Sequence, residues 1–219
     1  MHKTVQNLID IKNEIDEKIN ELNFLNYNPK IIAVTKTFNL EQIQPLLQYG
    51  HIHYGENKVQ EATKKWIDVK KNKLIKLHMI GKLQTNKVKD AIKIFDFIHS
   101  VDSEKLAKKI SDEQIKLGLK PKIFIQINLG KEKQKSGINL ENFKDFYNFC
   151  ISEGLDIIGT MCIPPLNNNV SKYFLKMKDL NFKNNLNELS MGMSLDYLVA
   201  LKFKSTYLRI GTKIFGERN

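Results

Sequence analysis

The chain has 219 residues, of which 42% are hydrophobic and 27% charged, with a formal net charge of +11 at pH 7, as in a soluble globular protein of one large or two small domains. No stretch approaches the roughly 20 apolar residues needed to cross a bilayer, and the N-terminal segment lacks the uninterrupted apolar run of a secretory signal. Two cysteines, Cys150 and Cys162, are too few for a disulfide framework and lack metal-ligand spacing, so we expect a cytoplasmic protein without a metal site.

The first segment, residues 1–28, is predicted to be a long amphipathic helix that ends at Pro29 and packs on the rest of the domain. Apolar residues recur along it at three- and four-residue spacing and form one stripe: Leu8, Ile11, Ile15, Ile19 and Leu22.

After Pro29, short apolar runs alternate with longer helical stretches. The runs are mostly continuous rather than alternating, as expected of parallel strands buried on both faces. The predicted strands cover 31–35, 51–54, 77–80, 97–101, 122–128, 157–161, 188–191 and 207–210, and the predicted helices lie near 39–49, 57–70, 85–95, 103–117, 140–153, 170–180 and 195–203.

Eight strands separated by helices predict a single (β/α)8 barrel of the TIM type over residues 1–219, near the lower size limit of about 200 residues for this fold. An open doubly wound sheet is the alternative, but it usually has fewer strands, and a G-x-G-x-x-G turn after the first strand would favour it. Here the first strand runs into Thr35-Lys36-Thr37 instead. No low-complexity tract or linker divides the chain, so we expect one domain.

Polar residues or glycines follow almost every predicted strand, at the end of the barrel where active sites collect. They include Lys36, Asn57, His78, Gly81, Ser100, Asn128, Gly192, Arg209, Gly211 and Thr212. This pattern predicts a functional site at the carboxyl ends of the strands.

Lys36 emerges directly from the first strand. A desolvated lysine can act as a nucleophile or form a Schiff base with an aldehyde, although a lysine in this position can also extend its ammonium group to solvent. Met193-Ser194 and Gly211-Thr212 are predicted to open the helices after strands seven and eight, where barrels commonly bind phosphate. Taken singly, Ser194 and Thr212 could be ordinary helix caps. An aldehyde-reactive lysine beside a phosphate site suggests pyridoxal 5′-phosphate (PLP) as the cofactor.

The excess of basic residues also raises nucleic-acid binding as a hypothesis, because basic surfaces attract phosphate backbones. All basic residues except Arg209 and Arg218 are lysines, spread along nearly the whole chain. No zinc-ligand pattern or aromatic RNA-binding motif accompanies them. We therefore interpret them as a solvated coat and expect no specific nucleic-acid partner and no membrane partner.

Successive sequence blocks resemble one family. They are IIAVTK, HYGENKVQE, HMIGKLQTNK, SVDS, IQINLGKEKQKSG and LSMGMSLDYLVA followed by STYLRIGTKIFGER. Together they resemble the YggS/PROSC family of pyridoxal phosphate homeostasis proteins, which is similar to the N-terminal barrel of alanine racemase. Two departures are visible: Lys204 stands where the family usually has glycine, and Tyr54 replaces the more usual phenylalanine, which adds a hydroxyl near the rim.

The resemblance implies that Lys36 holds PLP as a Schiff base. It also implies that Met193, Ser194, Gly211 and Thr212 bind the phosphate with neighbouring backbone groups. Arg209 would face the pyridine nitrogen, and Asn57 and His78 would line the pocket. No residue is assigned a catalytic role.

An arginine beside the pyridine nitrogen has a chemical consequence. PLP stabilises carbanions best when its ring nitrogen is protonated, and an arginine, which only donates, disfavours that proton. Racemisation also needs acid and base groups on both faces of the substrate, and in alanine racemase a separate β domain supplies one of them. We therefore favour a PLP carrier that supplies apo-enzymes, with other B6 vitamers as further candidate ligands, and we expect a monomer.

A small amino-acid racemase is the alternative, with a second base from His78, Tyr54 or Cys162.

Overall fold

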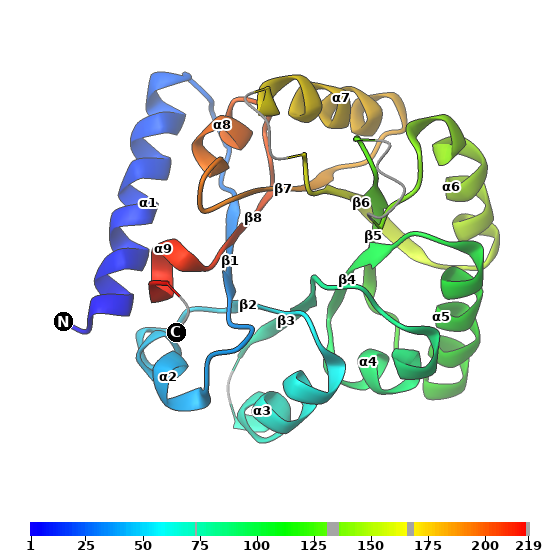
Figure 1. Cartoon of the computed structure of the whole chain (residues 1–219), viewed down its shortest axis with the longest axis horizontal. Helices are drawn as coiled ribbons and strands as arrows, with labels where there is room; N and C mark the ends of the chain where they lie inside the picture. The colour runs from blue at the N-terminus through cyan, green and yellow to red at the C-terminus, as the bar shows by residue number, and fades with distance from the viewer. Residues whose placement is uncertain (73, 131–135, 166–168, 218–219) are drawn as a thin grey trace.

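The computed structural model describes residues 1–72, 74–130, 136–165 and 169–217. Within them, eight parallel strands form one closed barrel in sequence order, with β8 paired to β1 (Figure 1). The strands are β1 (Lys30–Val34), β2 (His53–Glu56), β3 (Lys76–Met79), β4 (Phe97–Val101), β5 (Lys122–Ile127), β6 (Asp156–Cys162), β7 (Glu188–Met193) and β8 (Tyr207–Ile210). The predicted (β/α)8 barrel is confirmed.

The helices lie around the outside of the strand ring (Figure 1). They are α1 (Lys3–Glu21), α2 (Leu40–Tyr49), α3 (Val59–Asn72), α4 (Val88–Ile94), α5 (Glu104–Leu117), α6 (Phe143–Ser152), α7 (Val170–Lys183), α8 (Tyr197–Leu201) and α9 (Thr212–Phe215), with single 3-10 turns at Thr85–Lys87 and Leu140–Asn142. No helix in the described part of the chain is long and apolar enough to span a membrane.

The N-terminal helix α1 is present, and it buries the predicted apolar stripe, including Leu8, Ile11 and Ile15. It contacts α2, α8 and α9. The helix ends at Glu21, however, and the expectation that it continues to Pro29 is wrong. The chain turns at Asn23 and Asn26, which have φ of 53° and 55°, in the left-handed region that asparagine tolerates better than most residues.

Most other predicted boundaries shift by one to three residues, and two of the differences bear on the argument below. Strand β2 starts at His53 rather than residue 51, because Gly50 adopts φ of 86° and the His51 backbone N–H donates to the Leu46 carbonyl, so residues 50–52 belong to the turn that closes α2. Helix α8 starts at Tyr197, so Met193-Ser194 do not open it.

The interior of the barrel combines aromatic and aliphatic side chains with buried polar ones. One compact group of buried residues fills it: Ile32, Phe97, Phe124, Met161 and Tyr207. Buried polar side chains pack with this group, among them His78, His99, Ser190 and Arg209. The larger aliphatic core includes the residues by which α1 and other helices pack on the structure.

Candidate functional site

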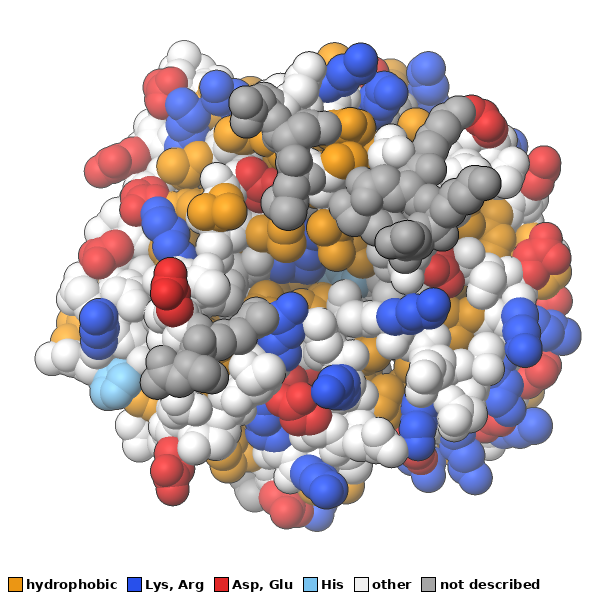
Figure 2. Space-filling view, in the orientation of Figure 1, with side chains coloured by type: hydrophobic (Ala, Val, Ile, Leu, Met, Phe, Trp, Pro, Cys, Tyr) orange, Lys and Arg blue, Asp and Glu red, His pale blue; other side chains and the backbone are white. Residues whose placement is uncertain are grey.

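A cavity of about 280 Å³ lies at the carboxyl end of the barrel. It is lined by residues from the ends of β1, β2, β3, β6, β7 and β8: Val34, Lys36, Asn57, Ile80, Ile163, Met193, Ser194, Leu195, Asp196, Arg209 and Thr212. Figure 2 views the molecule in this direction and shows a hollow near the centre of the face, with hydrophobic and basic side chains around it.

Six of the eight predicted site residues line this cavity, namely Lys36, Asn57, Met193, Ser194, Arg209 and Thr212. Gly211 is buried beside it, and its backbone N–H donates to Ser194 Oγ. His78 is fully buried inside the barrel and does not line the cavity. The fold thus brings together side chains that are up to about 180 residues apart, because β8 pairs with β1.

Lys36 sits in a tight turn that follows β1. Thr37, the next residue, has φ of 73°, a strained value for a β-branched side chain. The turn is held from α3: the Thr37 N–H donates to Glu61 Oε1 at 2.9 Å, and Lys65 Nζ donates to the Thr35 carbonyl at 2.9 Å. These bonds fix the backbone from which the Lys36 side chain enters the cavity.

Glu56, at the end of β2, also holds the turn after β1 in place. This role was not predicted from the sequence. Its carboxylate is fully buried, and Oε1 accepts from Thr35 Oγ1 at 2.7 Å, Lys65 Nζ at 2.9 Å and Trp66 Nε1 at 2.9 Å. The available signal was an acidic residue at the end of a strand, with a lysine and the single tryptophan in the helix that follows, 9 and 10 residues later in the chain.

Arg209 is buried at the floor of the cavity, with 4% of its surface exposed. Its guanidinium donates to Ser190 Oγ at 2.6 Å and to the Cys162 carbonyl at 2.8 Å. Burial lowers the pKa of Arg209, but a guanidinium remains protonated in proteins and only donates. The fixed fork carries five N–H donors, and these two bonds use two of them.

Ser194 joins the loops that follow β7 and β8. Its Oγ accepts from the backbone N–H groups of Gly211 at 3.3 Å and Lys213 at 3.4 Å. The hydroxyl therefore caps the segment after β8 rather than its own helix, and the hydroxyl proton can still be donated to a ligand. Thr212 starts α9 at the same place and is exposed.

Asp196 also lines the cavity and was not among the predicted site residues. Its Oδ1 accepts from the Met193 N–H at 2.6 Å, which closes the turn between β7 and α8. Burial raises the pKa of Asp196, and the Met193 hydrogen bond and the Arg209 charge oppose this rise. A carboxylate three residues after a strand-end methionine is a recognisable turn signal.

Gly81 allows the β3 loop to lie against the backbone that carries Asn57. A Cβ at Gly81 would stand 2.5 Å from the Asn57 carbonyl oxygen and 2.7 Å from its Cα, far inside any real contact. The glycine is therefore required by this close approach, and it fixes one wall of the cavity.

The two departures from the resembled family have structural consequences. Lys204 adopts φ of 58°, which explains why a glycine suits that position. The Tyr54 side chain is fully buried against Trp66, with ring centroids 4.7 Å apart, and its hydroxyl has no hydrogen-bond partner among the described residues. The expectation that this hydroxyl lies near the rim is wrong.

The comparisons with known proteins agree with this geometry. Residues 12–219 match the family model described as alanine racemase, N-terminal domain. The pyridoxal phosphate homeostasis protein of Aquifex aeolicus (strain VF5) is 37% identical over 199 residues, which cover 86% of this chain and 87% of that protein. The protein of the same name from Vibrio cholerae is 32% identical over 240 residues and covers 100% of this chain and 98% of its own length.

Solved structures give the same result. PipY of Synechococcus elongatus PCC7942, solved with PLP bound, matches with a TM-score of 0.80 at 32% identity, over 92% of this chain and 100% of that chain. Alanine racemase of Clostridium difficile 630 shares the fold, with a TM-score of 0.70 at 17% identity, over 94% of this chain and 57% of its own.

These matches define a class, the barrels of the alanine racemase N-terminal type. Within this class, the chain belongs to the family of pyridoxal phosphate homeostasis proteins.

Proposed function

We propose that this chain binds PLP in the cavity at the carboxyl end of the barrel, holds it as a Schiff base on Lys36 and supplies it to apo-enzymes. The observation that carries the proposal is the convergence of Lys36, Arg209, Ser194 and Thr212 on one cavity. The PLP-bound structure of PipY, which matches over nearly the whole barrel, supports it.

The donor set fits PLP. The cofactor offers an aldehyde, an anionic phosphate and a pyridine nitrogen, and when bound it supplies a reversible imine. Lys36 Nζ is the amine for the aldehyde carbon, with water as the leaving molecule. The Ser194 hydroxyl, the Gly211 and Thr212 backbone and the adjacent Met193 would hold the phosphate. Apolar side chains on the cavity wall, including Val34, Ile80 and Ile163, suit the ring.

Arg209 would face the pyridine nitrogen. Since a guanidinium donates and does not accept, it would hold this nitrogen unprotonated, which weakens carbanion stabilisation. Ser190 and the Cys162 carbonyl fix the guanidinium from behind, so the nitrogen would meet a pre-oriented donor. Asn57 lines the cavity beside these groups.

The residues considered as a second base argue against a racemase. His78, Tyr54 and Cys162 are all fully buried, and none of them lines the cavity. Burial raises the pKa of Cys162 to about 12 and that of Tyr54 above its usual value, and it lowers the pKa of His78. A binding and delivery role agrees better with this site, and our proposal is for a monomer in the cytoplasm.

The covalent assignment is tested by incubating the chain with PLP, reducing with borohydride and mapping the modified peptide. The expected result is a pyridoxyl group on Lys36 and loss of the visible absorption band in Lys36→Ala. Lys176→Ala, which removes an exposed lysine on α7, is the control and should behave as wild type. A pyridoxyl group on another residue, or none, would overturn the assignment.

Delivery is tested by mixing the PLP-loaded chain with an apo-enzyme in the presence of a PLP scavenger. Direct transfer predicts that the recovered activity of the apo-enzyme is proportional to the amount of loaded chain. It also predicts that this recovery is faster than the release of PLP from the loaded chain to the scavenger when no apo-enzyme is present. Equal rates would reject delivery while leaving PLP binding intact.

Exchange of the α-proton of alanine with solvent at enzymatic rates would instead support the racemase alternative.

A further inference from the structure

Behind Arg209, four side chains continue as one hydrogen-bonded row through the barrel interior. Ser190 Oγ lies 2.6 Å from the Arg209 guanidinium and 3.0 Å from His99 Nδ1. His99 Nε2 lies 2.9 Å from His78 Nδ1, and His78 Nε2 lies 2.9 Å from His53 Nδ1. The row passes from β8 through β7, β4 and β3 to β2, and so crosses the whole barrel.

The two inner imidazoles are held tightly. His78 and His99 are fully buried, and each stacks on a phenylalanine: His78 on Phe97, with centroids 4.2 Å apart, and His99 on Phe124, with centroids 4.1 Å apart. Burial lowers the pKa of both histidines, and each is therefore neutral near pH 7. A neutral imidazole has one donor and one acceptor nitrogen, so each ring passes on the hydrogen-bond direction that it receives.

Arg209 sets that direction. Its guanidinium can only donate, so the Ser190 oxygen accepts from it and the Ser190 hydroxyl proton is available for His99 Nδ1. With Nδ1 accepting, His99 carries its proton on Nε2 and donates to His78. By the same argument, His78 donates from Nε2 to His53.

We propose that Arg209 orders this row, so that His99, His78 and His53 are all neutral Nε2–H tautomers. Ser190 and the three histidines then act as positioning residues, which couple the cavity at Arg209 to the opposite end of the barrel. The order of the row is a property of the chain alone. Its effect on bound PLP rests on the proposed function.

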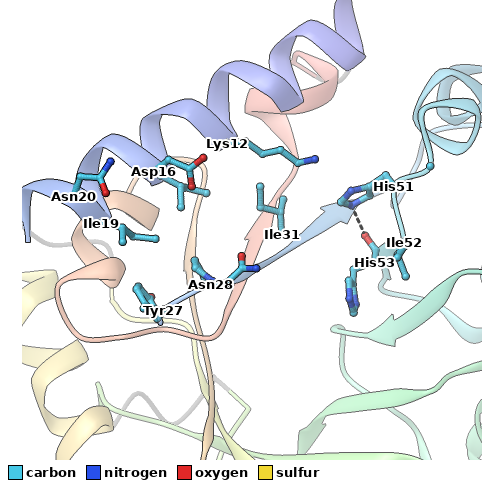
Figure 3. A pocket seen from close by; sticks show the side chains of 13 residues that line it. Lys12, Asp16, Ile19, Asn20, Tyr27, Asn28, Ile31, His51, Ile52 and His53 are labelled. Carbon is cyan, nitrogen blue, oxygen red and sulfur yellow. Dashed lines mark hydrogen bonds between the residues drawn. The ribbon is translucent and has the colours of Figure 1, made fainter. Parts of the chain in front are cut away.

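The outer end of the row opens on a second, polar pocket. His53 lines a pocket of about 830 Å³ between α1 and the amino end of the barrel, together with residues such as Lys12, Asp16 and His51 (Figure 3). His51 lies beside His53 but outside the row, because its Nε2 contacts the His53 carbonyl oxygen at 2.9 Å.

A proton on His53 and the ordered row exclude one another. An imidazolium donates from both nitrogens, whereas the row requires His53 Nδ1 to accept from His78. Burial, aided by Lys30 on β1 and Lys76 on β3, lowers the pKa of His53 to about 4, against Asp96 and Glu188, which raise it. Tyr207 on β8 also packs edge-on against the His53 ring. If the order of the row couples Arg209 to His53, linkage makes the effect reciprocal: a new acceptor at Arg209 changes the proton affinity of His53, and a proton on His53 changes ligand affinity at Arg209.

The order is tested by ¹⁵N NMR of the full chain without PLP, labelled at histidine. The expected result is that His53, His78 and His99 all show the Nε2–H pattern near neutral pH. A Nδ1–H tautomer or an imidazolium at any of the three would overturn the proposal. This measurement uses the wild-type chain and so does not depend on the folding of a variant.

Ser190→Ala removes the link between Arg209 and the histidines. The expected result is loss of the single tautomer at His99 and a rise in the pKa of His53, with the His51 resonances unchanged. Ser205→Ala, which removes another buried serine hydroxyl between β7 and β8 but outside the row, is the control and should leave all three tautomers in place. Unchanged histidine signals in Ser190→Ala would overturn the proposal.

Loading with PLP tests the coupling. The expected result is a shift in the pKa of His53 on loading in wild type and no shift in Ser190→Ala. Formation of the Lys36 adduct with an unchanged His53 pKa would reject the coupling and leave the proposed function intact. Ordered tautomers without a Lys36 adduct would reject the proposed function and leave the order intact.

Discussion

Acidification from pH 7.5 to pH 5.5 is expected to lower the free energy of unfolding by about 4 kcal/mol through His51, His78 and His99. Burial lowers the pKa of His51 to about 4 and the pKa values of His78 and His99 well below 6.5, whereas all three titrate near 6.5 in the unfolded chain. The unfolded state therefore binds more protons, and stability falls as the pH drops through 6.5 towards 4.

The magnitude follows from the unfolded state. At pH 5.5 an unfolded histidine is about nine-tenths protonated and its buried counterpart is neutral, which is worth about 1.3 kcal/mol for each residue relative to pH 7.5. His53, whose pKa is also lowered to about 4, adds to this loss in the same direction. The loss is large against a typical total stability of about 5–15 kcal/mol.

Urea unfolding followed by circular dichroism at a series of pH values measures this effect. The slope of the unfolding free energy against pH gives the number of protons taken up, and we expect about 2.7 from His51, His78 and His99 together at pH 5.5. His51→Gln removes one of them and should reduce the uptake by about 0.9 proton, while contributions from carboxyl groups cancel in the difference. A wild-type uptake below one proton, or an unchanged slope in His51→Gln, would refute the reasoning.

Three further predictions concern single positions. Lys204→Gly should be more stable than Lys204→Ala by about 1 kcal/mol in urea unfolding, because only glycine relieves the strain of φ 58°. Tyr54→Phe should raise the unfolding free energy by about 1 kcal/mol, because it removes a buried hydroxyl without a described partner. Gly81→Ala should weaken PLP binding about tenfold or more in absorbance titrations, because the added Cβ displaces Asn57.

Matched variants distinguish these effects from general damage. Both Lys204 variants lose the contact of the ammonium group with Phe24, so the difference between their unfolding free energies reports only the effect of the Cβ atom. Equal unfolding free energies would contradict the strain argument. Tyr197→Phe removes a hydroxyl that is hydrogen-bonded to Lys213 and should destabilise, opposite in sign to Tyr54→Phe. Gly154→Ala adds backbone strain at φ of 73° without a clash, since its Cβ meets nothing within 4 Å, and it should leave PLP affinity unchanged. Equal affinity in Gly81→Ala would reject the role of the close approach.

Much of the barrel could be predicted because its signals are local. Continuous apolar runs at regular spacing identify strands that are buried on both faces, and strand order follows from the alternation with helices. Once the barrel is closed, β1 must pair with β8, and this alone brings Lys36 close to Arg209. The cavity-lining positions of Lys36, Asn57 and Ser194 follow from the rule that sites collect at the carboxyl ends of the strands.

The rest depended on tertiary contacts that no sequence spacing encodes. Ser194 caps a segment 17 residues away in the chain, so its local context suggested a helix start that the structure does not have. His78 was expected to line the cofactor pocket, and its row with His53 and His99 was not predicted, because these hydrogen bonds depend on the inward or outward direction of three different strands. That direction is set by the stagger of the barrel, which is a property of the closed sheet rather than of any one strand.

The pairing of β1 with β8 has a consequence for biosynthesis. Lys36 leaves the ribosome early, whereas Arg209 and the loop after β8 emerge about 175 residues later, so a shorter nascent chain lacks part of the cavity lining. Contacts of such long sequence separation form late and slowly. PLP would therefore bind only after β8 has been synthesised and has paired with β1. Bound PLP would then contact residues on both sides of this last strand pairing and stabilise the closed barrel.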